Sequence, residues 1–426
     1  MTGRRIAIVG AGPAGLYALQ ALLTRPEVAG VDVFDRLPVP YGLVRYGVAA
    51  DHPKTRAVVR VFHRLLADPR VRFLGNVTIG THLQRDDLRA HYDAVVYATG
   101  ARLDRDLGIA GETLPGSLGA AEFVSWYSGH PDAVPADALA GARSAVVIGA
   151  GNVALDVVRI LGKDPASLRD TDMPDEVLAA LSRSTLTDIH LLARRGPADA
   201  RFSPLELREL GDVPDLDILV DRADLAADRA GLSGDAGRNL TLLDGLADRT
   251  PAGRGRRIHL HFWHRPIRIE GDGRVGAVVA EDPRTGTTVR YPADIVLRAI
   301  GYRAVPVPGL PFDDDRAIVP HTDGRIAPGE YVTGWLGRGP SGVIGTNRPD
   351  AVRAVASLVA DLPTLPQRPG TAPSAVPALL AARGVPVVDW AGWLRIEAHE
   401  AQLGARRGTA TVKLVDRARM LAIAAT

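Results

Sequence analysis

The sequence of 426 residues contains no cysteine. This absence excludes structural disulfides, cysteine-ligated iron–sulfur clusters and a catalytic dithiol. Charge of one sign is not in excess either, because 51 basic residues nearly balance 49 acidic ones, which gives no support to a nucleic-acid-binding protein. With 46% hydrophobic and 23% charged residues the composition is globular, and the length favours two domains.

A membrane-spanning run is also missing. Two arginines followed by the mostly apolar residues 6–23 resemble a signal peptide. That run, however, contains Gly10, Gly12, Pro13 and Gly15 and part of a predicted strand, so its removal would destroy the first element of the fold. We therefore expect no membrane association and a cytoplasmic protein.

The first informative motif joins a strand to a helix. The mostly apolar residues 5–9 lead into the G-x-G-x-x-G segment Gly10–Gly15, and a helical pattern follows. In such a segment the first glycine permits a tight turn, the second lets the backbone approach a pyrophosphate, and the third lets helix and strand pack closely. The next strand ends in Asp35, 20 residues after Gly15, where an acid can bind a ribose diol. This context favours a dinucleotide site over a glycine turn without a ligand.

A second unit of the same kind begins at residue 144. The predicted strand 144–148 leads into G-x-G-x-x-A from Gly149 to Ala154, and a helix follows. After an insertion at residues 162–187, the strand 188–193 ends in Arg194 and Arg195, where an enzyme specific for NAD carries an acid. Two guanidinium groups suit a 2′-phosphate, so the motif favours NADP(H) over NAD(H) and over two solvated arginines.

Three further stretches bear on function. Residues 202–210 predict a short helix with Ser203 as N-cap and Glu206 as its capping-box partner, which gives Glu206 a structural alternative to a binding role. Residues 222–257, rich in Asp, Arg, Gly and Ala, indicate a variable surface connection. Residues 257–262 alternate; with His264, the polar His259 and His261 could form a metal site, but the pattern favours a half-buried strand whose histidines face water. No metal site is predicted.

The last part of the chain opens with a predicted strand and a glycine-rich loop at residues 331–347. A helix is expected from Arg348 to Leu362, with Asn347 as N-cap, and its dipole would stabilise negative charge on a reduced flavin. Residues 363–377 contain five prolines and indicate a linker. Beyond them, Trp390 and Trp393 are spaced as on one helical face and are expected to dock the tail.

These motifs together resemble the adrenodoxin-reductase-type ferredoxin–NADP(+) reductases, and the resemblance covers nearly the whole chain. It rests on seven segments in the same order: Gly10–Gly15, Gly42–Val48, Asp51–Thr55, Gly151–Asp156, Arg194–Pro197, Glu206–Leu210 and Arg338–Asn347. The chain departs from the family at Ala150, where glutamine is common, and at residues 262–266.

The resemblance implies an α/β fold with two Rossmann-like dinucleotide-binding domains, the NADP domain being inserted into a discontinuous FAD domain. The expected boundaries are residues 1–102 and 301–426 for the FAD domain and 103–300 for the NADPH domain. Asp35 stands where relatives often have glutamate, so its contact with the adenosine ribose is expected to be longer or water-mediated. Motifs and resemblance together predict contacts with FAD from Gly10, Gly12, Pro13, Ala14, Gly15, Asp35, Leu43, Trp335, Gly342, Val343 and Ile344, and with NADPH from Gly149, Gly151, Asn152, Val153, Arg194, Arg195 and Glu206.

The activity implied is FAD-dependent electron transfer from NADPH to a ferredoxin-type iron–sulfur protein, by hydride transfer to flavin N5 and then single-electron steps. His52 and Glu209 are the candidate polar groups at the nicotinamide–flavin junction, and each has a structural hydrogen-bonding alternative. Because ferredoxins are usually acidic, the docking face should be locally basic, with Arg208 as its best-supported member. Two other activities stay open: an NADPH diaphorase or quinone reductase without a protein acceptor, and a non-catalytic NADP(H)-sensing flavoprotein.

Overall fold

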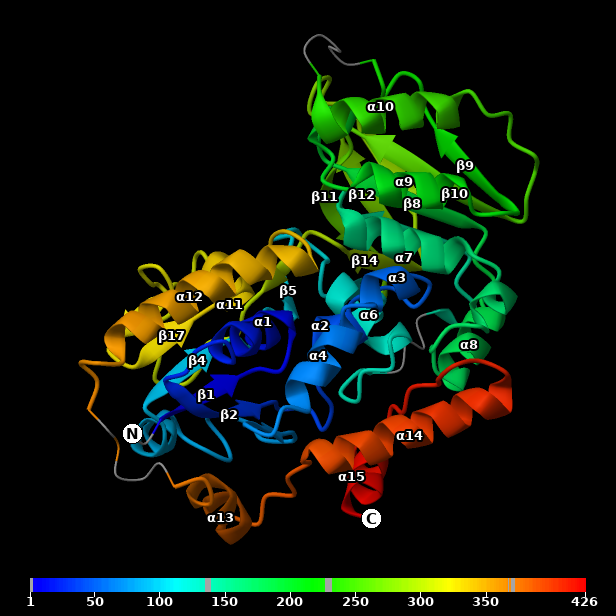
Figure 1. Cartoon of the computed structure of the whole chain (residues 1–426). Helices are drawn as coiled ribbons and strands as arrows, with labels where there is room; N and C mark the ends of the chain where they lie inside the picture. The colour runs from blue at the N-terminus through cyan, green and yellow to red at the C-terminus, as the bar shows by residue number, and fades with distance from the viewer. Residues whose placement is uncertain (1–2, 135–138, 227–231, 367, 369–371) are drawn as a thin grey trace. The chain divides into compact units, whose positions relative to one another are not determined.

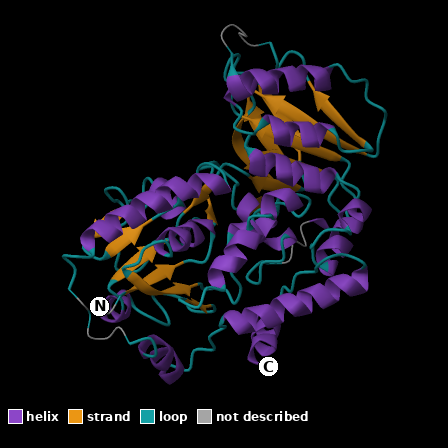
Figure 2. Ribbon diagram, in the orientation of Figure 1, coloured by secondary structure: helices purple, strands orange, loops and turns teal. Residues whose placement is uncertain are grey.

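The structure is a computed structural model that describes residues 3–134, 139–226, 232–366, 368 and 372–426. The chain divides into two compact units (Figure 1): residues 1–103 with 302–426, and residues 104–301 between them. Each unit contains a parallel sheet with helices packed beside it (Figure 2). The predicted fold class is confirmed. Among the described residues, no helix is both long and apolar enough to cross a bilayer.

The first unit is built around a six-stranded sheet of order β16-β17-β4-β1-β2-β3, in which only β16 runs antiparallel to its neighbour. Its strands are β1 (Arg4–Val9), β2 (Val28–Phe34), β3 (Val71–Leu74), β4 (Ala94–Tyr97), β16 (Arg325–Ala327) and β17 (Glu330–Val332). The short strands β5 (Leu103–Asp104) and β15 (Tyr302–Arg303) pair separately. The helices are α1 (Pro13–Leu22), α2 (Leu43–Tyr46), α3 (Pro53–Arg56), α4 (Val59–Leu66), α5 (Arg85–His91), α11 (Trp335–Arg338), η4 (Ile344–Thr346), α12 (Asn347–Asp361), α13 (Ala375–Ala382), α14 (Trp390–Arg407) and α15 (Arg417–Ala425).

The core of this unit joins the two ends of the chain. β1 lies between β2 and β4, with Ile8 paired to Val33 on one side and Val96 on the other. Central strands of a parallel sheet are buried on both faces, and their sequences are therefore nearly continuous apolar runs. Helices α1 and α12 lie side by side against the sheet (Figure 1). Trp393 is 1% exposed and belongs to the same core, so the predicted docking role of the tail is confirmed for this residue.

The second unit has an all-parallel sheet of order β6-β14-β7-β8-β10-β9. Its strands are β6 (Ser117–Gly119), β7 (Ser144–Ile148), β8 (Asp188–Ala193), β9 (Leu216–Val220), β10 (Arg256–Phe262) and β14 (Ile295–Arg298), and a separate antiparallel sheet contains β11 (Arg265–Glu270), β12 (Ala277–Glu281) and β13 (Thr288–Pro292). The helices are α6 (Ala120–Tyr127), α7 (Asn152–Gly162), η2 (Pro165–Leu168), α8 (Asp175–Ser182), η3 (Pro197–Asp199), α9 (Pro204–Gly211) and α10 (Gly234–Ala247).

Two different layers cover the parallel sheet of the second unit. Helices α7, α9 and α10 lie along one face (Figure 1). The three-stranded sheet packs on the other face, where Val146 and Leu192 of the large sheet meet Ile269 and Val278 of the small one. Elements η2 and α8 fill the insertion predicted between α7 and β8.

Two predicted connections contain helices instead. Residues 232–257 include α10, whose Leu240, Leu243 and Leu246 are buried, and β10 begins at Arg256. The polar composition concealed this spacing of one apolar side chain per turn; residues 227–231 of that prediction lie outside the described residues. In the predicted linker 363–377, α13 begins at Ala375, while residues 367 and 369–371 are likewise not described.

Two smaller predictions also need correction. Helix α12 begins at Asn347, so Asn347 is its first residue and not its N-cap; its Nδ2 donates to the Ile344 carbonyl at 3.0 Å. His259 and His261 do share one face of β10, but they are half-buried and do not simply face water. Burial lowers the pKa of His261 to about 3, so its ring is neutral at pH 7.

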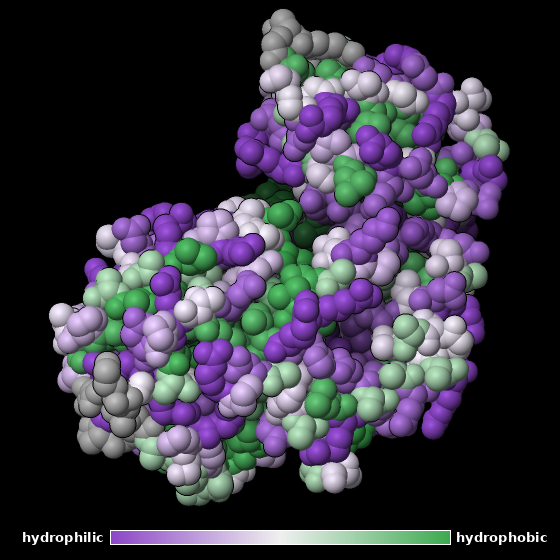
Figure 3. Space-filling model, viewed as in Figure 1, coloured by the Kyte–Doolittle hydropathy of each residue, from purple (hydrophilic) through white to green (hydrophobic). Residues whose placement is uncertain are grey.

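The distribution of polar and apolar residues on the surface is that of an ordinary globular protein, as the composition predicts. Polar residues are spread over the visible face of each unit (Figure 3). The exposed large apolar side chains are few among the described residues, and they include Val343, which is 64% exposed, and Leu205, which is 57% exposed. Isolated exposed apolar residues are ordinary in globular proteins, so Val343 gains meaning only from its place in the glycine-rich loop described below.

Candidate dinucleotide sites in two parallel-sheet units

The loop after β1 is shaped by glycines that no other residue can replace. Gly10 has φ +112°, and a Cβ there would lie 2.4 Å from the Ala98 carbonyl oxygen. A Cβ on Gly15 would lie 2.0 Å from the Gly10 oxygen. At Gly12, by contrast, the nearest atom to a Cβ would be Gly42 Cα at 3.9 Å. Gly10 and Gly15 are therefore required by the fold itself, whereas Gly12 borders open space at the start of α1.

Helix α1 offers unpaired backbone amides to that space. Gly12 is its N-cap and has no side chain to accept a hydrogen bond, and Pro13 follows as the first helical residue. Ala14 comes next and is buried. Uncapped amides and the positive end of the helix dipole together form a ready anion-binding site.

Asp35 fixes the same loop from the end of β2. Its Oδ2 accepts from the Ala11 amide and its Oδ1 from the Leu37 amide, each at 2.9 Å. Burial raises the pKa of the Asp35 carboxyl, and the Leu37 and Ala11 amides oppose that shift. Each oxygen keeps a second lone pair, so the carboxylate can order the loop and still accept from a ribose hydroxyl.

Two more loops approach this one at the carboxyl edge of the sheet. Tyr41 and Gly42 have positive φ, +84° and +49°, and a Cβ on Gly42 would lie 2.9 Å from Gly12 Cα. After β17, a Cβ on Gly334, with φ +68°, would lie 2.3 Å from the Ala14 Cβ. The structure thus brings together three backbone segments from distant parts of the chain, around the start of α1.

The loop after β17 also contains a polar group without a partner. Thr333 is 3% exposed, and within the described part of the chain its hydroxyl makes no hydrogen bond. Buried polar groups in native proteins are nearly always paired, so this hydroxyl indicates a bound group. The neighbouring Trp335 stacks on Tyr302 with ring centroids 5.7 Å apart and donates from Nε1 to the Ser341 carbonyl at 3.0 Å.

The remaining residues predicted at this site lie in the same unit. Leu43 is the first residue of α2 and is half-buried. Gly342 has φ +81° and is exposed, as is Val343, and Ile344 begins η4 just before α12.

A buried ion pair holds the 41–48 loop in place, and the sequence contained no local sign of it. Arg45 Nη2 lies 2.5 Å from Glu400 Oε1, and Glu400, on α14, is 2% exposed. Glu400 Oε1 also accepts from the Leu414 amide at 2.8 Å, and Lys413 Nζ donates to the Arg45 carbonyl at 2.8 Å. Partners more than 350 residues apart cannot be inferred from local spacing, so only the fold reveals this contact.

In the second unit, the loop after β7 has nearly the same geometry as the loop after β1 in the first unit. Gly149 has φ +137°, and a Cβ there would lie 2.2 Å from the Ala299 carbonyl oxygen. Gly151 is the uncapped N-cap of α7 and has no heavy atom within 4 Å of a Cβ position. Asn152 Oδ1 accepts from the Ser203 amide at 2.8 Å, and Val153 lies in the first turn of the helix.

Arg194 and Arg195 follow β8 and are both exposed. Arg195 Nη1 lies 3.2 Å from Asp199 Oδ1, a pair in which both side chains are more than 40% exposed. Such exposed pairs contribute little to stability, so Arg195 can exchange this partner for a phosphate at small cost.

Glu206 does not complete the predicted capping box. Ser203 caps α9, accepting from the Glu206 amide at 3.3 Å. The Ser203 amide, however, donates to Asn152, and Glu206 Oε2 lies 3.3 Å from Nη1 of Arg159, which is 1% exposed. Arg159 also binds Asp156 at 2.6 Å. A buried arginine needs carboxylate partners, which gives Glu206 a structural function that the sequence did not reveal.

Three other predicted residues are distributed between the units. His52 lies in the first unit, just before α3, with Nε2 4.0 Å from Asp51 Oδ1. Arg208 and Glu209 lie on α9 of the second unit, and Arg208 is exposed.

Glycine loops at the carboxyl edges of two parallel sheets define an oxidoreductase of the type that binds two dinucleotides. Residues 4–178 match the family model described as pyridine nucleotide-disulphide oxidoreductase. The chain is 43% identical to NADPH-ferredoxin reductase FprA of Mycobacterium tuberculosis, with 98% of both proteins covered. It is 39% identical to the mitochondrial NADPH:adrenodoxin oxidoreductase of Arabidopsis thaliana, covering 99% of this chain and 95% of that protein.

A solved structure of Mycobacterium tuberculosis FprA in complex with NADPH matches with a TM-score of 0.94 and 41% identity, with 100% of both chains covered. The chain therefore belongs to the family of NADPH–ferredoxin and adrenodoxin reductases. The resemblance inferred from the seven sequence segments is confirmed.

Proposed function

We propose that this protein is an NADPH–ferredoxin reductase, which carries electrons from NADPH through FAD to a ferredoxin-type iron–sulfur protein. The observation that carries this proposal is the pair of glycine loops, each with an uncapped helix start, in a chain that matches such reductases over its full length. When bound, FAD would supply the redox chemistry, namely uptake of a hydride from NADPH and release of single electrons. The protein supplies binding, orientation and electrostatics.

We assign FAD to the first unit, with a domain of residues 1–102 and 301–426. The amides at the start of α1, beside Gly12, bind the pyrophosphate, and Asp35 holds the adenosine ribose. Where the three loops meet, side chains on Gly42 and Gly334 would overlap neighbouring atoms, so the loops approach one another as main chain alone. Main chain without side chains can approach a flat ligand closely. Leu43, Trp335 and residues 342–344 line the flavin, and the Thr333 hydroxyl gains a partner when the flavin is bound.

Two alanine substitutions separate FAD binding from folding. Gly12→Ala should leave the melting temperature of the FAD-free protein nearly unchanged, because a Cβ there meets nothing closer than 3.9 Å, yet it should weaken FAD binding about tenfold or more by blocking the pyrophosphate. Gly15→Ala should destabilise the protein by about 1–3 kcal/mol, because its Cβ overlaps the Gly10 oxygen. Thermal unfolding and FAD titration test both; a Gly12→Ala protein that binds FAD normally would refute the assignment.

We assign NADPH to the second unit, residues 103–300. The amides at the start of α7, near Gly149, Gly151 and Val153, bind its pyrophosphate, and Asn152 and Glu206 complete the site. Arg194 and Arg195 bind the 2′-phosphate, since both are exposed where the ribose of the cofactor is recognised.

The choice of NADPH over NADH should depend on these two arginines. The double variant Arg194→Gln, Arg195→Gln should raise the KM for NADPH about tenfold to hundredfold, because it loses hydrogen bonds to a charged phosphate, while the KM for NADH stays unchanged. Arg238→Gln, which removes an exposed arginine from α10 of the same unit, is the matched control. Equal losses with both cofactors would show that the arginines do not recognise the phosphate.

His52 and Glu209 are proposed as polar groups that orient the nicotinamide for hydride transfer. His52→Ala should slow reduction of bound flavin by NADPH in anaerobic stopped-flow mixing, while FAD affinity is kept. The partially exposed His63 of α4 provides the control variant His63→Ala. An unchanged reduction rate would remove His52 from the mechanism.

The acceptor is proposed to dock on a basic face that includes Arg208, which is exposed on α9. We also propose a cytoplasmic location, because the residues that resemble a signal peptide form β1 and α1 of the fold.

Anaerobic mixing of the FAD-loaded protein with NADPH or NADH, then cytochrome c reduction with and without added ferredoxin, tests the whole proposal. We expect rapid bleaching that is selective for NADPH, and turnover that ferredoxin stimulates. Stimulation should decline as ionic strength rises and should weaken in Arg208→Gln, because attraction between exposed charges is screened by salt. Bleaching without ferredoxin stimulation would favour a diaphorase, and no bleaching would exclude the enzyme activity.

A further inference from the structure

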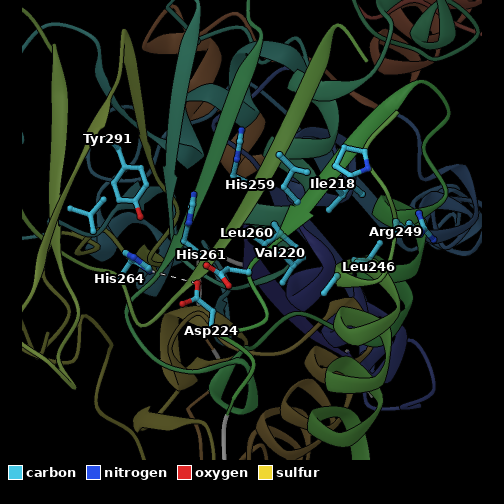
Figure 4. A pocket seen from close by; sticks show the side chains of 15 residues that line it. Ile218, Val220, Asp224, Leu246, Arg249, His259, Leu260, His261, His264 and Tyr291 are labelled. Carbon is cyan, nitrogen blue, oxygen red and sulfur yellow. Dashed lines mark ion pairs between the residues drawn. The ribbon is translucent and has the colours of Figure 1, made fainter. Parts of the chain in front are cut away.

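Four histidines gather in the second unit, away from any role in the proposed electron transfer. They lie where the large parallel sheet meets the three-stranded sheet, and His259, His261 and His264 line a cavity of about 600 Å³ (Figure 4). His190 comes from β8, His259 and His261 from β10, and His264 from the turn before β11. Asp224, 6% exposed, reaches the same cavity from the turn after β9.

The register of the parallel strands β8 and β10 brings His190, His259 and His261 together. His259 pairs with His190 across β10 and β8, and His261 lies two residues further on the same face. The β10–β11 turn then brings His264 back, with its amide donating to the Ala193 carbonyl at 2.9 Å.

Two groups of three could hold an ion, and their ring geometry distinguishes them. In the group His190, His259 and His261 the rings are stacked: the planes of His259 and His261 differ by only 2° and those of His190 and His259 by 22°. Imidazole lone pairs lie in the ring plane, so near-parallel rings are poorly placed to direct three lone pairs at one ion.

In the other group, Asp224, His261 and His264, the side chains are better oriented to direct their ligand atoms at one ion. The His261 and His264 rings are inclined by 64°, and one ligand atom of each of the three residues lies within 4.8 Å of the others. His264 Nδ1 is 3.9 Å from Asp224 Oδ2 (dashed line in Figure 4). Ligands bound to a metal ion at about 2.0–2.2 Å lie somewhat closer together than this, so modest side-chain rotation would complete the site.

Hydrogen bonds from outside the group hold each of these side chains. Asp224 Oδ2 accepts from the Phe262 amide at 3.0 Å, and His264 Nδ1 donates to the Phe262 carbonyl at 2.7 Å. His261 Nε2 lies 3.0 Å from His190 Nδ1. The bond from the Phe262 amide can remain as an outer hydrogen bond that orients Asp224, because a carboxylate oxygen has a second lone pair. When a metal binds through His264 Nδ1, it replaces the bond to Phe262.

We propose that the second unit binds a divalent first-row transition-metal ion, with Zn²⁺ as the reference case, through Asp224, His261 and His264. Two imidazoles and one carboxylate suit Zn²⁺, Co²⁺ or Ni²⁺, whereas Mg²⁺ and Ca²⁺ prefer oxygen ligands alone. All three side chains line the cavity, so the remaining coordination positions open into it.

Metal binding should stabilise the second unit. The three ligands come from the turn after β9, from β10 and from the β10–β11 turn, so one ion would join three segments of the chain. An ion that binds the folded state and not the unfolded state raises the melting temperature by mass action.

Cobalt provides a direct probe. The FAD-loaded protein is stripped of metal with a chelator, dialysed and titrated with Co²⁺, and the d–d absorption bands are followed as difference spectra; Zn²⁺ is then added to displace Co²⁺. We expect one Co²⁺ per chain, displacement by Zn²⁺ and a higher melting temperature with Zn²⁺. His264→Gln and Asp224→Asn should each weaken Co²⁺ binding about tenfold or more.

His259→Gln is the matched control, because it removes a neighbouring histidine and leaves the proposed ligands intact. Its Co²⁺ affinity should stay within about twofold of that of the unsubstituted protein. Reduction of bound FAD by NADPH in each variant verifies that the protein is folded and keeps this test independent of the ferredoxin proposal. Absence of d–d bands, or equal loss of affinity in His259→Gln and His264→Gln, would overturn the proposal.

Discussion

The close approach of three backbone segments at the carboxyl edge of the first sheet is the constraint on which the rest of this unit depends. Gly12, Gly42 and Gly334 belong to loops after three different strands, and Cβ atoms on the last two would overlap the start of α1. Only glycine lets main chain come so near to main chain while adopting positive φ. The loops thereby present amides and not side chains to one small region, which is what a ligand with a pyrophosphate and a flat ring requires.

Contacts with helix α14 near the C-terminus stabilise one of these loops. Arg45 in the 41–48 loop pairs with buried Glu400 of α14, and Trp393 of the same helix packs edge to face on Tyr41 at 5.7 Å. Removing one partner of a buried ion pair leaves an uncompensated charge and costs several kcal/mol, far more than an exposed pair contributes. The tail thus stabilises the segment 41–48, which contains α2, although it lies more than 340 residues away in sequence.

The sequence revealed those parts of the sites that depend on local backbone geometry. Gly10, Gly15 and Gly149 are needed by the strand–turn–helix unit itself, so a short pattern was enough to predict them. The place of Arg194 and Arg195 after β8 also followed from the pattern, because the end of the second strand is a fixed position in such a unit, whereas their role toward a phosphate stays a prediction. Contacts that depend on strand register or on packing between distant elements were not predictable. Glu206 was predicted as a capping partner, but it pairs with buried Arg159, and His190 joined the histidines of β10 only through the pairing of β8 with β10.

The two units share one loop geometry and differ in the charge at the end of their second strand. In both, the first glycine lies against a carbonyl of the strand on the far side: Gly10 against Ala98, and Gly149 against Ala299. The second strand then ends differently. In the first unit Asp35 places a carboxylate at the end of β2, and each of its oxygens accepts from one loop amide. In the second unit Arg194 and Arg195 place two exposed positive charges at the end of β8. Under the proposed assignment of FAD and NADPH, the charge at one strand end distinguishes the two dinucleotides, because a carboxylate repels a 2′-phosphate and guanidinium groups attract it, while the glycine loop is the same in both.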